Sequence, residues 1–237
     1  MHKYILLFLS LFCCSCGLPN YTYLLKPIVN RVSPLIEKEG EYFNVSGNNE
    51  ANYLGHQLYY KLYHSKSLMQ TQERQIAGTT YDSVSYIKSK GFNLIYKVDT
   101  SKSEPDIVHK NPLLLIKNQD DKNVEFSVQL DFSENTMGNT DSFQSSLICD
   151  YLGYKYYLCR YVKQNRIDKD NTEYKVKSFF QESFSKDDAD IHKNYKAGES
   201  LYMLVYAVAF GRGDSCQNLY SDPSLVGRFE LEVENFN

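Results

Sequence analysis

Residues 201–233 constrain the fold of this chain more than any other stretch. The first arm, residues 201–210, is almost wholly apolar and rich in Val, Tyr and Phe, which is typical of a strand inside a β-sheet. The second arm, residues 225–233, alternates apolar and charged side chains, as a strand with one buried face does. The residues between the arms include Gly, Asp, Ser and Pro, which favour turns. The sequence therefore predicts two antiparallel strands joined by an exposed loop.

That loop carries an Arg-Gly-Asp tripeptide, formed by Arg212, Gly213 and Asp214. The segment VYAV at 205–208, followed two residues later by GRGDS at 211–215, resembles the last two strands of the cell-adhesive type III module of fibronectin. That module is a β-sandwich whose RGD loop binds integrins. Its aspartate joins a receptor-bound cation, and its arginine reaches an acidic pocket. The resemblance implies a receptor-binding role for the three residues, although this chain lacks the core Trp of the family.

Residues 1–16 have the pattern of an export signal. The apolar run at 4–12 (YILLFLSLF) has the length of a signal peptide and is too short to span a bilayer as a helix. It ends close to Cys16, which has a small residue on each side. This arrangement resembles the lipobox of bacterial lipoproteins of the spirochaetal type, in which the cysteine is acylated. The resemblance predicts Cys16 as the lipidated residue, with Cys14 as the alternative.

The rest of the chain is predicted to be all-β. We expect residues 17–26 to form a tether and residues 27–237 to form an antiparallel β-sandwich like that of immunoglobulin or fibronectin type III domains, with a long central insertion at about 65–200. Strands expected at 26–33, 41–47 and 56–64 would close against the two C-terminal strands. Further strands are expected at 92–98, 113–117, 123–132, 154–162 and 173–184, with 113–117 and 123–132 paired as a hairpin, and one short helix is expected at 82–90.

A second organisation stays open. The tripeptide Tyr-Leu-Gly begins a tyrosine-rich segment at residue 53 and another at residue 151. Their separation suits a repeated β module. The alternative is therefore two tandem β modules split near residue 140.

The mature chain would keep three cysteines besides the anchor, namely Cys149, Cys159 and Cys216. An exported protein is exposed to oxidising conditions, so one disulfide can form and one thiol is left over. We expect the bond between Cys149 and Cys216, both placed in loops, and a reduced Cys159 inside a strand.

Nothing in the sequence predicts an enzyme, a metal site or a cofactor. The acidic segments 168–173 and 187–192 lack the glycine of a calcium-binding loop and are expected to be solvated. His56 and His64 flank one predicted strand and are expected at the surface. The net charge of −3 and the absence of a basic stripe argue against a nucleic-acid partner.

These observations predict a lipoprotein of the bacterial cell envelope, held by N-terminal acyl chains at the outer membrane or cell surface. Its predicted role is that of a non-catalytic protein-binding module, with host adhesion through the RGD loop to an integrin-like receptor. The alternative is a structural or assembly lipoprotein that binds another envelope protein and has no host ligand.

Overall fold

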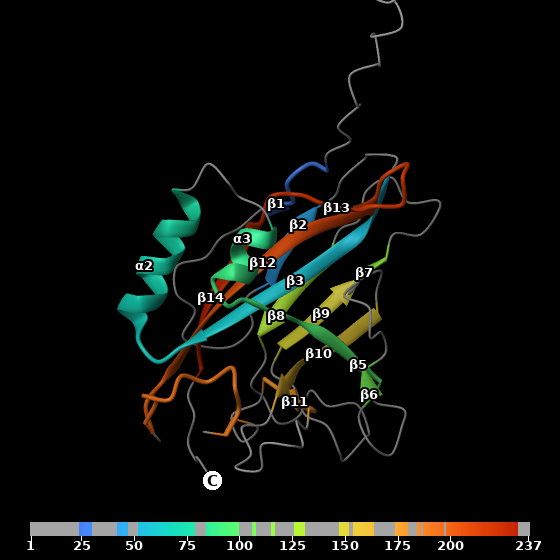
Figure 1. Cartoon of the computed structure of the whole chain (residues 1–237). Coiled ribbons are helices and arrows are strands. Elements are labelled where there is room, and N and C mark those ends of the chain that lie inside the picture. Colours follow the sequence, from blue (N-terminus) through green and yellow to red (C-terminus); the bar gives the residue numbers. More distant parts are fainter. Residues whose placement is uncertain are drawn as a thin grey trace, which may run out of the picture.

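The computed structural model describes residues 24–29, 42–46, 52–78, 84–99, 106–107, 115–116, 126–130, 147–151, 154–163, 174–179, 184–185, 187–196 and 198–231 (Figure 1). In chain order, the elements are β1 (Ile28–Val29), β2 (Tyr42–Ser46), β3 (Tyr53–Tyr63), α2 (Lys66–Ala77), α3 (Val84–Ser89), β4 (Asn93–Leu94), β5 (Tyr96–Asp99), β6 (Asp106–Ile107), β7 (Leu115–Ile116), β8 (Phe126–Leu130), β9 (Leu147–Tyr151), β10 (Tyr154–Lys163), β11 (Tyr174–Ser178), β12 (Leu201–Arg212), β13 (Asn218–Tyr220) and β14 (Ser224–Leu231).

The smaller sheet is built on the long antiparallel pair of β3 and β12. In the described part of the chain its order is β13-β12-β3-β4, with β14 also paired to β12 and β7 to β3. The register of β12 with β3 runs from Tyr202 opposite Tyr63 to Gly211 opposite Tyr53. The prediction that residues 201–210 form a strand paired with a returning strand is confirmed, because Leu201 lies opposite Leu231 of β14.

The larger sheet has the order β1-β2-β8-β9-β10-β5-β6 among the described residues, with β11 paired to β10. Its pairings are antiparallel throughout. The predicted hairpin between residues 113–117 and 123–132 is wrong, because β7 pairs with β3 whereas β8 pairs with β2 and β9. The segment 65–200, expected as an insertion, supplies most of this sheet, and the β8–β9 pair crosses residue 140.

The main core lies between the two sheets. Alternate residues of a strand share a face, so Leu58, Tyr60 and Leu62 of β3 point the same way and are buried in this core. Leu147 and Leu158 reach the same core from the larger sheet. Leu24, which falls in the segment predicted as a tether (residues 17–26), is also buried in this core.

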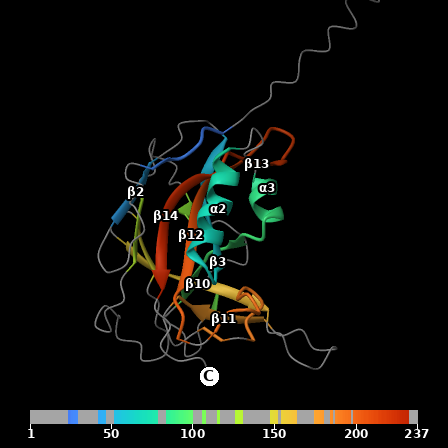
Figure 2. The ribbon, with the colours of Figure 1, turned by 90° about the vertical axis from the view of Figure 1, so that its left-hand side faces the viewer.

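Two helices cover the outer face of the smaller sheet. Figure 2 shows α2 and α3 on one side of β3 and β12, and β2 on the other. A second buried cluster joins the helices to the sheet: Tyr59, Tyr63, Met69, Ile76, Val84, Ile87, Phe92, Leu204, Tyr206 and Val208. Strand β12 is thus buried on both faces, which explains why its sequence is almost continuously apolar.

The coarse prediction of an all-β, antiparallel class is confirmed, since the structure is mostly strand. The helix expected at 82–90 is present as α3, and Gly91 follows it with φ of 82°, a conformation that suits glycine. Helix α2 was not predicted.

In the described residues, no helix has both the length and the apolar character that a membrane span requires. The predicted signal peptide and Cys16 lie outside the described residues.

Candidate functional site

The predicted RGD tripeptide lies at the hairpin that joins β12 to β13. Arg212 is the last residue of β12, where its backbone N–H donates to Asn52 O at 3.0 Å. The turn is closed by two further backbone bonds: Gly213 N donates to Gln217 O at 2.8 Å, and Cys216 N donates to Gly213 O at 2.9 Å. Cys216 takes a positive φ of 61°. The expected long loop is therefore a short hydrogen-bonded turn followed by β13.

The two charged side chains of the tripeptide are both exposed, and the glycine between them is buried. A Cβ atom at Gly213 would lie 2.4 Å from Nε2 of Gln217, so the turn leaves no room there without a shift of that side chain. Arg212 and Asp214 are therefore exposed on either side of the buried Gly213, on a backbone held by hydrogen bonds. The prediction of an exposed RGD loop is confirmed in its placement, while its receptor-binding role stays a prediction.

The cysteines do not form the expected bond. Cys149, Cys159 and Cys216 are all free thiols in the structure. Cys149 was expected in a loop, but it lies inside β9 and is fully buried in the main core, whereas Cys216 is exposed in the hairpin turn. The predicted Cys149–Cys216 disulfide is therefore absent. Cys159 is buried in β10, and burial raises the pKa of its thiol to about 12, although the adjacent Arg160 opposes this shift.

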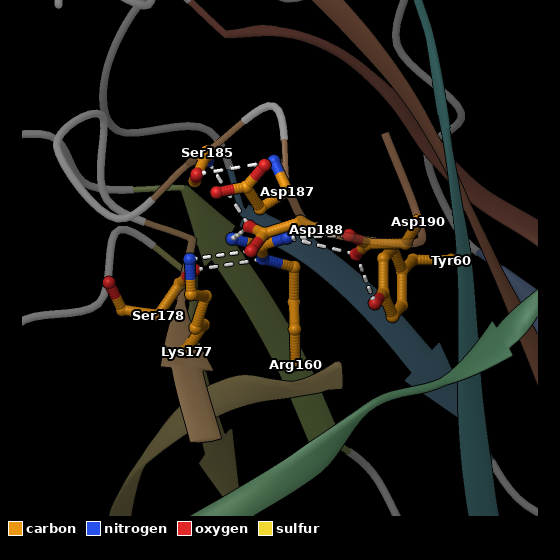
Figure 3. A network of polar contacts seen from close by, with 8 residues as sticks. All are labelled: Tyr60, Arg160, Lys177, Ser178, Ser185, Asp187, Asp188 and Asp190. Carbon is orange, nitrogen blue, oxygen red and sulfur yellow. Dashed lines mark hydrogen bonds and ion pairs between the residues drawn. The ribbon is translucent and has the colours of Figure 1, made fainter. Parts of the chain in front are cut away.

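A buried ionic network surrounds Arg160 of β10 (Figure 3). The Arg160 side chain is fully buried, and its Nη1 donates to both carboxylate oxygens of Asp190 at 2.9 Å. Its Nη2 pairs with Asp188 at 3.2 Å, and its Nε donates to the Ser178 carbonyl at 3.0 Å. The guanidinium also lies 4.2 Å above the ring of Phe184. Arg160 thus joins β10 and β11 to the irregular segment that precedes β12.

Further groups complete this network. Tyr60 of β3 donates to Asp190 at 2.7 Å, and Lys177 of β11 pairs with Asp188 at 2.5 Å. Burial acts to lower the pKa of Arg160, but the attraction of Asp190, Tyr60 and Asp188 outweighs it and raises that pKa. Arg160 therefore stays protonated, and the network ties β3, β10 and β11 to the segment before β12.

The expectation that segment 187–192 is solvated was wrong for two of its aspartates, because the side chains of Asp188 and Asp190 are buried. The sequence of β10 could have indicated such a buried acidic residue. Leu158 and Val162 are buried, and Arg160 occupies the alternate position between them, so it shares their inward face. An arginine at such a position requires a buried acidic partner.

The two histidines of the predicted aromatic strand differ in environment. His56 was expected at the surface but is fully buried, and its Nδ1 shares a short hydrogen bond with the Tyr53 hydroxyl. Strand pairing explains this, since Ala209 of β12 and Leu115 of β7 lie on either side of His56. His64, half-buried, stacks on His192 with ring centroids 4.3 Å apart. Across the described ranges, no group of three or more metal-ligating side chains occurs.

Tyrosines gather on the outer side of β5, β10 and β11. Tyr161 and Tyr174 stack with ring centroids 5.1 Å apart and remain 43% and 50% exposed. Tyr96 meets the edge of Tyr161 at 5.8 Å. We call these three residues the tyrosine face. Exposed, mutually ordered tyrosines are common at protein interfaces because one end of the ring is apolar and the hydroxyl is polar.

Comparisons with protein-family models, with curated proteins and with solved structures gave no match to this chain. Its function therefore has to be inferred from its own surface. Two features of that surface are suited to a protein partner: the RGD hairpin and the tyrosine face.

Proposed function

We propose that this protein is a lipoprotein of the bacterial envelope that acts as a non-catalytic binding module, with the β12–β13 hairpin as its contact with a protein partner. The observation that carries the proposal is the exposure of both Arg212 and Asp214 on an ordered turn around a buried Gly213. A loop that is already ordered loses little conformational entropy when it binds.

The chemistry of the hairpin fits an integrin-like receptor. The carboxylate of Asp214 would complete the coordination of a receptor-bound cation, and the guanidinium of Arg212 would enter an acidic pocket. The negative carboxylate and the positive guanidinium project from the same short turn. A partner must therefore present a cation and an acidic group at a matching distance. This requirement gives specificity in addition to attraction.

Changing Asp214 to Glu should abolish most of the adhesion of integrin-bearing cells to the purified protein. The substitution keeps the charge but moves the carboxylate by one methylene, which a metal-bound site tolerates poorly, so we expect at least about a tenfold loss of affinity. The matched control is Asp187→Glu, which makes the same change at an exposed position away from the hairpin and should leave adhesion unchanged. Equal adhesion by Asp214→Glu and wild type would contradict receptor binding through the hairpin.

Membrane attachment is tested separately. We expect Cys16→Ala to move the protein from the membrane fraction to the soluble fraction, because the proposed anchor is the acyl chains on that cysteine. Metabolic labelling with a radioactive fatty acid, comparing Cys16→Ala with Cys14→Ala, identifies the acylated residue. Retention of label in Cys16→Ala together with its loss in Cys14→Ala would show that Cys14 is the anchor.

The tyrosine face supports a second candidate function, assembly with another envelope protein. Its stacked Tyr161 and Tyr174 remain exposed although they are large and ordered. Protease treatment of intact cells separates the two functions. A host-binding protein must be cleaved from outside, whereas full protection of the chain would favour the assembly role.

A further inference from the structure

A pocket of about 300 Å³ lies where the end of β3 meets α2. The end of β3 and the residue after it line one side of the pocket, α2 lines another along most of its length, and a single residue reaches the pocket from the segment before β12. The lining residues are Lys61, Leu62, Tyr63, His64, Leu68, Thr71, Gln72, Gln75 and His192. This volume is at the lower end for small-molecule sites, and the mixture of apolar walls with a few polar groups is typical of them.

The pocket is basic. Lys61, His64 and His192 contribute its titratable nitrogen groups, and no carboxylate is among its lining residues. Lys61 Nζ donates at 2.5 Å to two neutral acceptors, Gln72 Oε1 and the Lys90 carbonyl. Within the described part of the chain, no carboxylate forms an ion pair with Lys61. A half-buried ammonium with only neutral acceptors favours an anion that comes from outside.

The position of Lys61 is unfavourable for its own charge. Burial lowers the pKa of Lys61, and the neighbouring Lys90 lowers it further. The ammonium also lies 5.2 Å above the ring of Tyr63. Lysine has three N–H donors, and two of them are used by Gln72 and Lys90, so one remains for a ligand.

His192 supplies a second donor to the pocket. Its Nδ1 accepts a hydrogen bond from the backbone N–H of Asn194 at 3.1 Å, which places the proton of the neutral ring on Nε2. Burial and the charge interactions with His64, Lys193 and Lys61 lower the pKa of His192, which favours its neutral ring. The stack on His64, tilted by 27°, fixes its orientation.

These donors do not suit a metal ion. A metal needs a free lone pair, but Nδ1 of His192 is already engaged and Nε2 carries the proton. The pocket lining also has no acidic or cysteine ligand. An oxyanion, in contrast, accepts hydrogen bonds from an ammonium and an imidazole N–H at the same time.

We propose that this pocket binds a small organic anion, with its carboxylate or phosphate group held by Lys61 and His192 and its apolar part against Leu68. The site is independent of the RGD hairpin and of the membrane anchor. Benzoate and phenyl phosphate are suitable probes, since each joins one oxyanion to one ring and is small enough for the volume.

The test is calorimetric titration of the purified full-length chain in detergent. We expect saturable binding of at least one of the two probes, and the preferred probe shows whether the natural ligand carries a carboxylate or a phosphate. His192→Phe keeps a ring to stack on His64 but removes the donor, so it should weaken binding by about tenfold, and Lys61→Met should do at least the same. Lys175→Met removes an exposed charge on β11 and should have no effect.

His192 is exposed, so His192→Phe should leave the fold intact even if Lys61→Met does not. Three outcomes would overturn the proposal. One is that neither probe saturates the wild-type protein. Another is that His192→Phe binds as tightly as wild type. The third is that zinc chloride binds to the wild type in a manner that depends on His192 and excludes both anions.

Discussion

Replacing Arg160 by alanine should destabilise the protein by about 3–5 kcal/mol, close to the limit of what a single domain tolerates. The substitution removes the cation but leaves Asp188 and Asp190 in a site from which water is largely excluded. Asp188 keeps Lys177 and Asp190 keeps the Tyr60 hydroxyl, but both carboxylates lose the buried cation that offsets most of their desolvation cost. Urea unfolding followed by circular dichroism measures the loss directly.

The fold provides a matched control for this experiment. Arg228 of β14 pairs with Glu73 of α2, with 2.6 Å between Nε and Oε2, but both side chains are partly exposed. Water replaces the lost partner there, so Arg228→Ala should cost only about 1 kcal/mol or less. If Arg160→Ala lowered the free energy of unfolding no more than Arg228→Ala does, the expected large contribution of the buried Arg160 network would be contradicted.

A further variant separates a lost charge from lost packing. The variant combines Arg160→Met with Asp188→Asn and Asp190→Asn. It leaves no buried carboxylate at these positions, and the methionine side chain fills the space of the arginine methylene groups. We expect this triple variant to be clearly more stable than Arg160→Ala. Equal instability of the two would mean that shape, and not charge, dominates at residue 160.

The strands around β12 could be predicted from the sequence because their signal is local. Residues 201–210 are apolar on both faces, and that is what a strand between a sandwich core and a helical layer requires. The partner strands β3 and β14 carry their own aromatic or alternating patterns. Tertiary packing here agrees with local preference, so the predicted pairing was correct.

Elements with a weaker pattern were missed for identifiable reasons. Helix α2 buries only Met69 and Ile76 fully, so most of its turns are polar and show little helical periodicity. Strand β7 is two residues long and pairs with the distant β3, so its nearness in sequence to β8 suggested a hairpin that does not form. Short strands take their partners from tertiary contacts that no local pattern encodes.

The candidate sites also combine features that the local sequence predicts with features that depend on contacts between distant segments. The exposure of the RGD turn follows from turn-forming residues and was predictable, whereas its shortness depends on β13, whose three residues have little pattern of their own. The basic pocket depends on the stack of His64 on His192, which brings together segments far apart in the chain. Only the arginine in β10 gave a local sign of a long-range partner.

The second large effect concerns acid stability, and His56 is its source. Burial lowers the pKa of this imidazole from 6.5 to about 3. In the unfolded chain His56 takes up a proton near pH 6.5, while in the folded protein it stays neutral until about pH 3. The unfolded state therefore binds more protons between these values. The resulting stabilisation is complete above pH 6.5 and is lost as the pH falls toward 3.

We expect the free energy of unfolding to fall by on the order of 4 kcal/mol through His56 alone between pH 7 and pH 3. Carboxylates also respond to acid, so the quantity to compare is the slope for wild type against His56→Gln, which cannot titrate. In a histidine proton NMR titration, the His56 ring signal should stay constant from pH 8 to pH 4. An ordinary midpoint near pH 6.5, or identical acid slopes for His56→Gln and wild type, would show that His56 accepts its proton without unfolding the sheet.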